Sequence, residues 1–180
     1  MGRIGGAERG CGRRNLAESS EGCGAQGHKE LCLSSRAAAH ITCAVMKFRY
    51  DTRYTEHGFE MAPRVPVVFQ NPLNKREIPI FCLVDSGASE ILIAIEVALA
   101  LGIDIERGEP RIYGGIGGEI KGYVHAITMR LMNDRHEFAV ECGVLPLPAY
   151  DGLLGQRGFF DHYKVTFEKY KETFEITAKK

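Results

Sequence analysis

Short apolar segments separated by turn residues dominate the chain from Met46 onward, and they limit the fold to a mainly β structure. Segments rich in β-branched and aromatic residues and bounded by glycine, proline, asparagine or aspartate are typical of strands. Only residues 93–101 have the composition and period of a helix, and Gly102 follows as a stop. We therefore predict a small closed β-barrel with one short helix. The predicted strands cover residues 64–70, 77–84, 123–131, 137–144, 164–168 and 173–177.

Residues 1–45 differ in kind from residues 46–180. They contain eight of the 21 glycines and four of the six cysteines, and no strand or helix period persists in them. Such a segment buries too little apolar surface to offset the conformational entropy lost on ordering, which predicts a disordered tail. We favour the alternative that translation begins at Met46, because strand-like sequence follows that residue directly.

Two further interpretations of residues 1–45 are disfavoured. The glutamates in this segment disfavour an organelle transit peptide, because such peptides are poor in acidic residues. Zinc-ligand types are present but widely spaced, without the C-x2-C pair that pre-forms half of a tetrahedral site, so a plain tail is favoured over a metal site. The candidate zinc ligands are Cys11, Cys23, His28, Cys32, His40 and Cys43.

Charge and hydropathy exclude two classes of partner. Lysine and arginine total 23, and aspartate and glutamate total 23, so the net charge is zero and the basic footprint of a nucleic-acid-binding protein is absent. The chain has no run of about 18 apolar residues, the minimum for a membrane-spanning helix. No apolar run follows the first basic residues, so a secretory signal is not indicated. We expect a cytoplasmic protein with no nucleic-acid or membrane partner.

The segment that carries chemistry is 81–89, FCLVDSGAS. An apolar strand here ends on Asp85, which would place the carboxylate at the rim of the core. Gly87 allows the backbone to turn and another chain to approach closely, and Ser86 can form a hydrogen bond to that chain. Taken alone, the tripeptide also fits an ordinary strand-ending turn.

Two more sequence elements follow the Asp85 segment, and their order along the chain makes the segment more specific than a turn. A glycine-rich segment, YGGIGGEIK, spans residues 113–121, and Leu-Leu-Gly ends at Gly155, 70 residues after Asp85. In this order the three elements resemble the active-site loop, the flap and the loop-supporting element of retropepsin-like (retroviral-type) aspartic proteases. The segment 158–176 is similar to the short helix and closing strands of cellular members, so the resemblance covers about residues 63–177.

The resemblance implies a retropepsin-like protease domain over residues 46–180, with an acid-protease-type barrel. Aspartic proteases use two carboxylates that share one proton: one activates a water, and the other protonates the substrate carbonyl. The sequence holds one Asp-Ser/Thr-Gly only, and 180 residues leave no room for two pepsin-like lobes. A homodimer would supply Asp85 from each chain at a two-fold axis.

The resemblance also assigns roles to the neighbours of Asp85. Ser86 is expected to bind across the dimer axis, and Gly87 and Ala88 to hold the loop with the Gly87 amide near the carboxylates. The flap would cover an extended polypeptide substrate. No cofactor and no metal are expected, because the carboxylate pair itself activates the water. The flap residues are Gly114, Gly115, Ile116, Gly117 and Gly118, and the loop-supporting residues are Leu153, Leu154 and Gly155.

Alternatives to an aspartic endopeptidase remain open at the level of sequence. A dimeric peptide-binding module of the same fold is one, and a barrel with an ordinary turn at Asp85 is another. The intact Asp-Ser-Gly favours the enzyme, because a binding module does not require a carboxylate pair at the axis. Neither H-E-x-x-H nor G-x-S-x-G is present, so motif support for a metalloprotease or a serine hydrolase is missing. Cys82 and Cys142 fall in predicted strands and are expected to be buried thiols.

Overall fold

The computed structural model describes residues 45–56, 58–115 and 118–179. The described residues belong to one compact unit of the chain. The predictions for the tail and for its six candidate zinc ligands concern residues 1–44, which lie outside the described residues, as do Ile116 and Gly117 of the predicted flap.

The described part of the chain is mainly β with one short α-helix, as predicted. Two 3₁₀ turns, Ile105–Arg107 and Lys169–Lys171, accompany the helix α1 (Ile95–Ala100). The strands are β1 (Val45–Arg49), β2 (Asp51–Thr55), β3 (Gly58–Ala62), β4 (Arg64–Gln70), β5 (Glu77–Val84), β6 (Ile91–Ala94), β7 (Glu109–Gly115), β8 (Gly118–Leu131), β9 (Phe138–Leu145), β10 (Gly152–Leu154), β11 (Tyr163–Glu168) and β12 (Thr173–Ala178).

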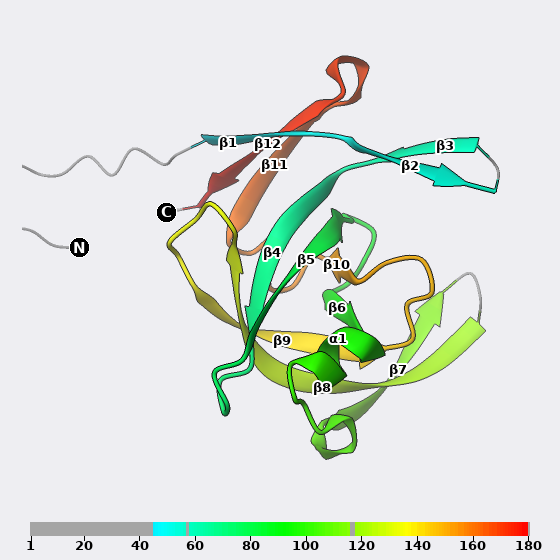
Figure 1. The fold of residues 1–180 in the computed structure, drawn as a ribbon, viewed down its shortest axis with the longest axis vertical. Helices are drawn as coiled ribbons and strands as arrows, with labels where there is room; N and C mark the ends of the chain where they lie inside the picture. The colour runs from blue at the N-terminus through cyan, green and yellow to red at the C-terminus, as the bar shows by residue number, and fades with distance from the viewer. Residues whose placement is uncertain (1–44, 57, 116–117, 180) are drawn as a thin grey trace, which may run out of the picture. The chain divides into compact units, whose positions relative to one another are not determined.

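Seven strands form the main sheet in the order β4-β5-β10-β6-β9-β8-β7. Strand β4 also pairs with β8, so the pairings of six of these strands run in a circle and β7 lies outside it (Figure 1). Two of the pairings, β5 with β10 and β6 with β9, are parallel. Strands β1, β12 and β11 form a separate antiparallel sheet, and β2 and β3 form a hairpin.

The apolar core lies inside the circle of strands and under α1. Alternate residues of β8 contribute to it: Ile127, Met129 and Leu131 are at most 1% exposed. Tyr123 and His125, nearer the start of the strand, are half-buried. Other strands of the main sheet and α1 add further members, among them Val65, Phe69, Val84, Ile93, Ala98, Leu101 and Leu154, and the separate sheet adds Tyr163, Phe174 and Ile176.

The helix is shorter than predicted. Ile93 and Ala94 belong to β6, which pairs with β9 on one side and β10 on the other, and α1 begins only at Ile95. Residues 91–101 are almost continuously apolar, and a buried strand cannot be separated from a buried helix by periodicity in such a run. The short helix that the resemblance implies at the start of residues 158–176 is instead a series of hydrogen-bonded turns.

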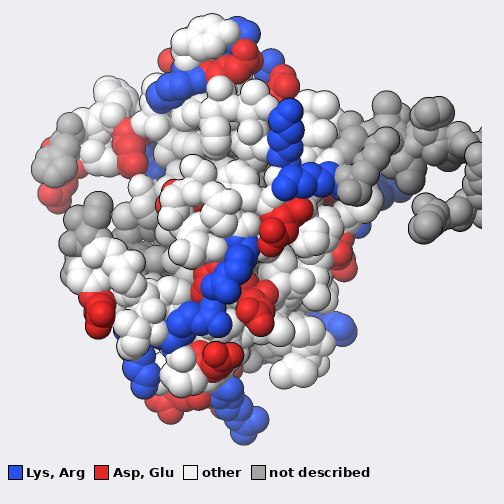
Figure 2. Space-filling model, turned by 180° about the vertical axis from the view of Figure 1, so that it is seen from behind, with Lys and Arg blue, Asp and Glu red and all other residues white. Residues whose placement is uncertain are grey.

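No helix within residues 45–56, 58–115 and 118–179 combines the length and apolar character needed to cross a membrane. Lys, Arg, Asp and Glu side chains intermingle on the face of the protein drawn in Figure 2, and the described residues of that face show no broad patch of one sign.

Candidate active site

Asp85 directly follows β5, and its backbone is held from two sides. Residues 82–84 of β5 pair in parallel with residues 152–154 of β10, and the Asp85 amide donates a hydrogen bond to the Leu154 carbonyl at 3.1 Å. One residue earlier, the Val84 amide donates to the Pro63 carbonyl at 2.9 Å. These bonds fix the end of the strand and leave the Asp85 side chain half-buried at its rim.

The Asp85 carboxylate accepts a hydrogen bond from the loop that follows it. The Gly87 amide donates to Asp85 Oδ1 at 2.9 Å, and the Ala88 amide donates to the Asp85 carbonyl oxygen at 3.3 Å. A Cβ on Gly87 would lie only 3.2 Å from the same Oδ1. The carboxylate therefore faces a backbone amide, and Ser86 and Gly87 are exposed.

Residues after β10 hold the loop from below. The Gln156 amide donates to the Ala88 carbonyl at 2.9 Å, and the Arg157 amide donates to the Ser89 carbonyl at 3.0 Å. The Gln156 side chain adds a bond from its Nε2 to the Ser86 carbonyl oxygen at 2.6 Å. The Leu-Leu-Gly element therefore lies next to the Asp85 loop, where the sequence interpretation placed it.

Gly155 makes this contact possible. A Cβ at this position would collide with the Glu90 carbonyl oxygen and would lie 2.7 Å from that of Ala88. Both neighbours are backbone atoms, which cannot turn aside as a flexible side chain can. Leu154, in β10, is fully buried, and Leu153 is half-buried beside β6.

The predicted flap is the tip of a hairpin. Strands β7 and β8 run side by side up to the pairs Gly114–Glu119 and Gly115–Gly118 (Figure 1). Gly118 has φ +103°, which favours glycine, and a Cβ on Gly114, Gly115 or Gly118 would meet nothing within 4 Å. The described tip residues are exposed, and the structure shows no contact between them and Asp85.

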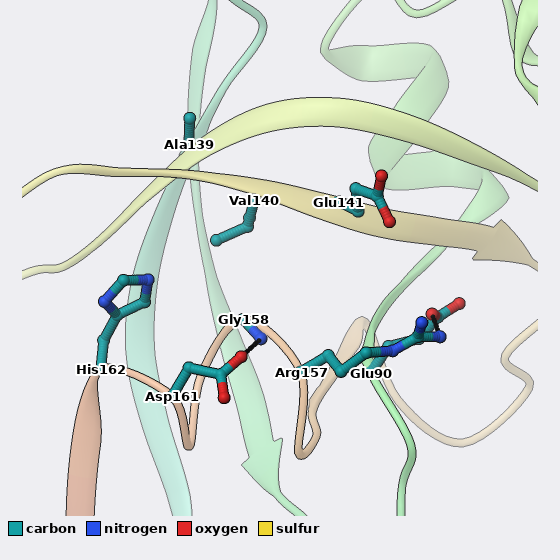
Figure 3. Close-up of a pocket in the computed structure, with 8 residues that line it drawn as sticks. All are labelled: Glu90, Ala139, Val140, Glu141, Arg157, Gly158, Asp161 and His162. Atoms are coloured by element: carbon teal, nitrogen blue, oxygen red, sulfur yellow. Dashed lines mark hydrogen bonds and ion pairs between the residues drawn. The ribbon is translucent and has the colours of Figure 1, made fainter.

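A buried carboxylate that the sequence interpretation missed lies beside the loop. Glu90 is 2% exposed, and its Oε1 accepts a hydrogen bond from the Tyr113 hydroxyl at 2.6 Å. Its Oε2 accepts from Arg111 Nη1 at 2.7 Å. The same oxygen is also contacted by Arg157 Nη2 (Figure 3). A lone glutamate before an apolar run carries no sequence signal of this role, because its three partners come from distant segments.

The charges around Glu90 compensate one another. Two guanidinium groups, from Arg111 and Arg157, offset the cost of burying one carboxylate. Burial and the hydrogen bond to Glu90 raise the pKa of Tyr113, so its hydroxyl stays protonated and remains a donor. The cluster of Glu90, Arg111, Tyr113 and Arg157, below called the Glu90 node, is therefore satisfied as a unit.

A pocket of about 250 Å³ opens beside this node (Figure 3). Glu90 and Arg157 lie at one end, and Asp161 and His162 lie at the other, where Asp161 accepts a hydrogen bond from the Gly158 amide. Asp85 does not line it. Among the described residues, no group of three or more His, Cys, Asp or Glu side chains is arranged to hold a metal ion.

Similarity to known proteins covers the segment of the chain that holds this site. Residues 72–157, which include the Asp85 loop, the flap hairpin and the Leu-Leu-Gly element, match the family model described as aspartyl protease. The structure is similar to that of a retropepsin-like aspartic protease from Rickettsia conorii, with a TM-score of 0.53 and 19% identity over 73% of this chain and 98% of that chain. No curated protein matches the sequence.

A second solved structure, EIAV protease complexed with an inhibitor, gives a TM-score of 0.42 and 21% identity over 54% of this chain and 84% of that chain. Residues 72–157 thus carry the sequence of the aspartyl protease family, and the fold around them is that of retropepsin-like aspartic proteases. The predicted resemblance to aspartyl proteases is confirmed for residues 72–157, and the fold agrees with that of a retropepsin-like aspartic protease.

Proposed function

We propose that the chain is an aspartic endopeptidase that acts as a homodimer and hydrolyses peptide bonds with a water held between two Asp85 carboxylates. The observation that carries this proposal is the geometry of Asp85. Its amide donates to the Leu154 carbonyl, and the Val84 amide just before it donates to the Pro63 carbonyl. Its carboxylate faces the Gly87 amide, and its side chain reaches the surface. One carboxylate of the pair acts as the base on water while the other protonates the substrate carbonyl oxygen.

The second carboxylate comes from a second copy of the chain. The sequence has a single Asp-Ser-Gly, and a two-fold interface brings a residue near its own copy. Within the described part of the chain, the exposed Ser86 hydroxyl has no hydrogen-bond partner, which suits a bond to the partner's loop. In this proposal residues 46–180 form the protease domain, and the circle of six strands is the closed barrel of each subunit.

The substrate is an extended polypeptide. The exposed backbone of the β7–β8 hairpin offers strand edges to which a peptide main chain can pair, and the glycines Gly114, Gly115 and Gly118 leave space at the tip. The proposal therefore assigns residues 114–118 to substrate covering and Leu153, Leu154 and Gly155 to loop support.

The test compares cleavage of an unstructured protein by the full chain and by its Asp85→Asn variant, from acid to neutral pH. We expect cleavage by the parent, its inhibition by a pepstatin-type compound, and none by Asp85→Asn with dimer and fold intact. Asp151→Asn is the matched control, since Asp151 is followed directly by Gly152 without the hydroxyl residue of Asp-Ser-Gly, and its change should leave cleavage unchanged.

Retained cleavage by a clean Asp85→Asn preparation would refute the assignment of the catalytic residue. A dimeric parent that binds peptides but cleaves none would instead support the non-catalytic peptide-binding module.

A further inference from the structure

The Glu90 node joins two parts of the site that are distant in sequence. Arg111 and Tyr113 lie in β7, whereas Glu90 follows the Asp85 loop, and Arg157 follows the Leu-Leu-Gly element. All the polar contacts of the Glu90 side chain therefore hold either the flap strand or the support beneath the loop.

The ring of Tyr113 lies in a slot made by two glycines. A Cβ on Gly143 of β9 would collide with the Tyr113 hydroxyl oxygen, and one on Gly122 of β8 would lie 2.8 Å from Tyr113 Cε2. Both glycines are buried. Because neither has a side chain, the ring can cross β8 and β9 and bring its hydroxyl to Glu90.

The same node is rigidly connected to the loop of Asp85. The Glu90 carbonyl oxygen packs against Gly155, and the Arg157 amide donates to the Ser89 carbonyl at 3.0 Å. Any shift of Glu90 is thereby transmitted to the segment that begins at Asp85, and any shift of Tyr113 is transmitted to β7.

We propose that Glu90 is a positioning residue that anchors β7 to the Asp85 loop and so sets where the flap strands lie relative to the catalytic carboxylates. This inference rests on the proposed function for its kinetic consequence, although the anchor itself is a physical contact. The anchor therefore fixes the distance between Asp85 and a substrate that pairs with the β7–β8 hairpin. Loss of the anchor weakens substrate binding, because the hairpin must then be ordered by the substrate.

The first variant is Tyr113→Phe, which keeps the ring in its slot and removes the bond to Glu90. We expect the KM of a peptide substrate to rise about tenfold, while kcat changes less than about twofold. The matched control is Tyr163→Phe. Tyr163 is buried, and its hydroxyl likewise donates a hydrogen bond to a carboxylate oxygen, Asp134 Oδ2, at 2.9 Å. Tyr163 lies outside β7 and the Asp85 loop. The control should lower the melting temperature comparably and leave KM unchanged.

The second variant, Gly143→Ala, displaces the ring without altering any node residue, and its Cβ would also lie 2.7 Å from Leu92 Cδ2 at the end of a flexible side chain. It should raise KM as Tyr113→Phe does, and the double variant should show no further rise, because both changes break one contact. The proposal would be overturned if the effects of Tyr113→Phe and Gly143→Ala on KM were additive in the double variant. It would also be overturned if Tyr113→Phe and Tyr163→Phe changed KM equally.

Amide hydrogen exchange separates the anchor from the protease assignment. Peptides covering β7 and residues 85–89 should exchange faster in Tyr113→Phe than in the parent, whereas β11 and β12 should not change. Unchanged exchange in β7 would overturn the anchor whatever the activity. If the parent cleaves nothing, faster exchange at both segments supports the anchor and overturns only the protease assignment.

Discussion

Gly155 lies so close to Ala88 that a Cβ on the glycine would approach the Ala88 carbonyl oxygen to 2.7 Å. That oxygen also accepts a hydrogen bond from the Gln156 amide, so the two segments cannot separate without losing it. The contact forms one wall of the Asp85 loop. It explains why a glycine ends the Leu-Leu-Gly element.

Gly155→Ala should therefore lower the free energy of unfolding by about 2 to 3 kcal/mol, the cost of overpacking against atoms that cannot move aside. Urea unfolding followed by circular dichroism measures this. The control is Gly115→Ala, where a Cβ meets nothing within 4 Å and the expected change is below about 0.5 kcal/mol. Equal changes in the two variants would contradict the account of Gly155.

Mixed dimers test whether both carboxylates of the proposed pair are required. Parent and Asp85→Asn chains, co-expressed in equal amounts with different tags, should have about a quarter of the activity of the parent alone, because only parent–parent dimers keep two Asp85 carboxylates. Activity at one half would mean that each chain works independently. Sedimentation of the mixture checks that the heterodimers form.

Asp134 should contribute to the pH dependence of stability. Burial opposes its ionised form, but hydrogen bonds from the His136 amide, the His136 ring and the Tyr163 hydroxyl prevail and lower the pKa of Asp134. Because the folded-state pKa is the lower one, ionised Asp134 stabilises the protein above the unfolded value of about 3.9. That contribution is lost as the pH falls through the folded-state pKa.

Asp134→Asn should accordingly flatten the acid limb of a plot of unfolding free energy against pH, with its largest effect above about pH 5. Urea unfolding at a series of pH values measures it. Asp104→Asn is the control, since this exposed carboxylate pairs with Arg107 at the surface and should leave the acid limb nearly unchanged. If Asp134→Asn lowered the free energy of unfolding equally at all pH values, the role given to ionised Asp134 would be contradicted.

The thiols of Cys82 and Cys142 should not react in the folded protein. Both are fully buried, as the sequence pattern predicted, and burial raises the pKa of each thiol. Iodoacetamide should label these two residues only in denaturant, which peptide mass spectrometry can follow. Labelling under native conditions at the denatured rate would show that β5 and β9 open far more readily than their packing indicates.

Strands bounded by clear turn residues could be predicted from the sequence. The bounds of β4 and β5 agree with the predicted segments 64–70 and 77–84, because Asn71 and Pro72 stop one strand and polar residues precede the next. The place of Asp85 at the end of an apolar strand followed from the same pattern.

Other elements could not be found in this way, for physical reasons. The three residues of β10 are too few to show a period, and they form a strand only because β5 and β6 pair with them. The β2–β3 hairpin was missed as well. Glu90 could not be assigned, because its role depends on Arg111, Tyr113 and Arg157, which only the tertiary fold brings together.

The Gln156 side chain reaches the Ser86 carbonyl across 70 residues of sequence. Closing so long a loop costs conformational entropy, which is repaid only when residues 152–157 pack against the Asp85 loop. During synthesis, a chain that has emerged only as far as β9 contains Asp85 but not the segment that supports it. The Asp85 loop therefore gains these supporting contacts only after the segment 152–157 has been synthesised.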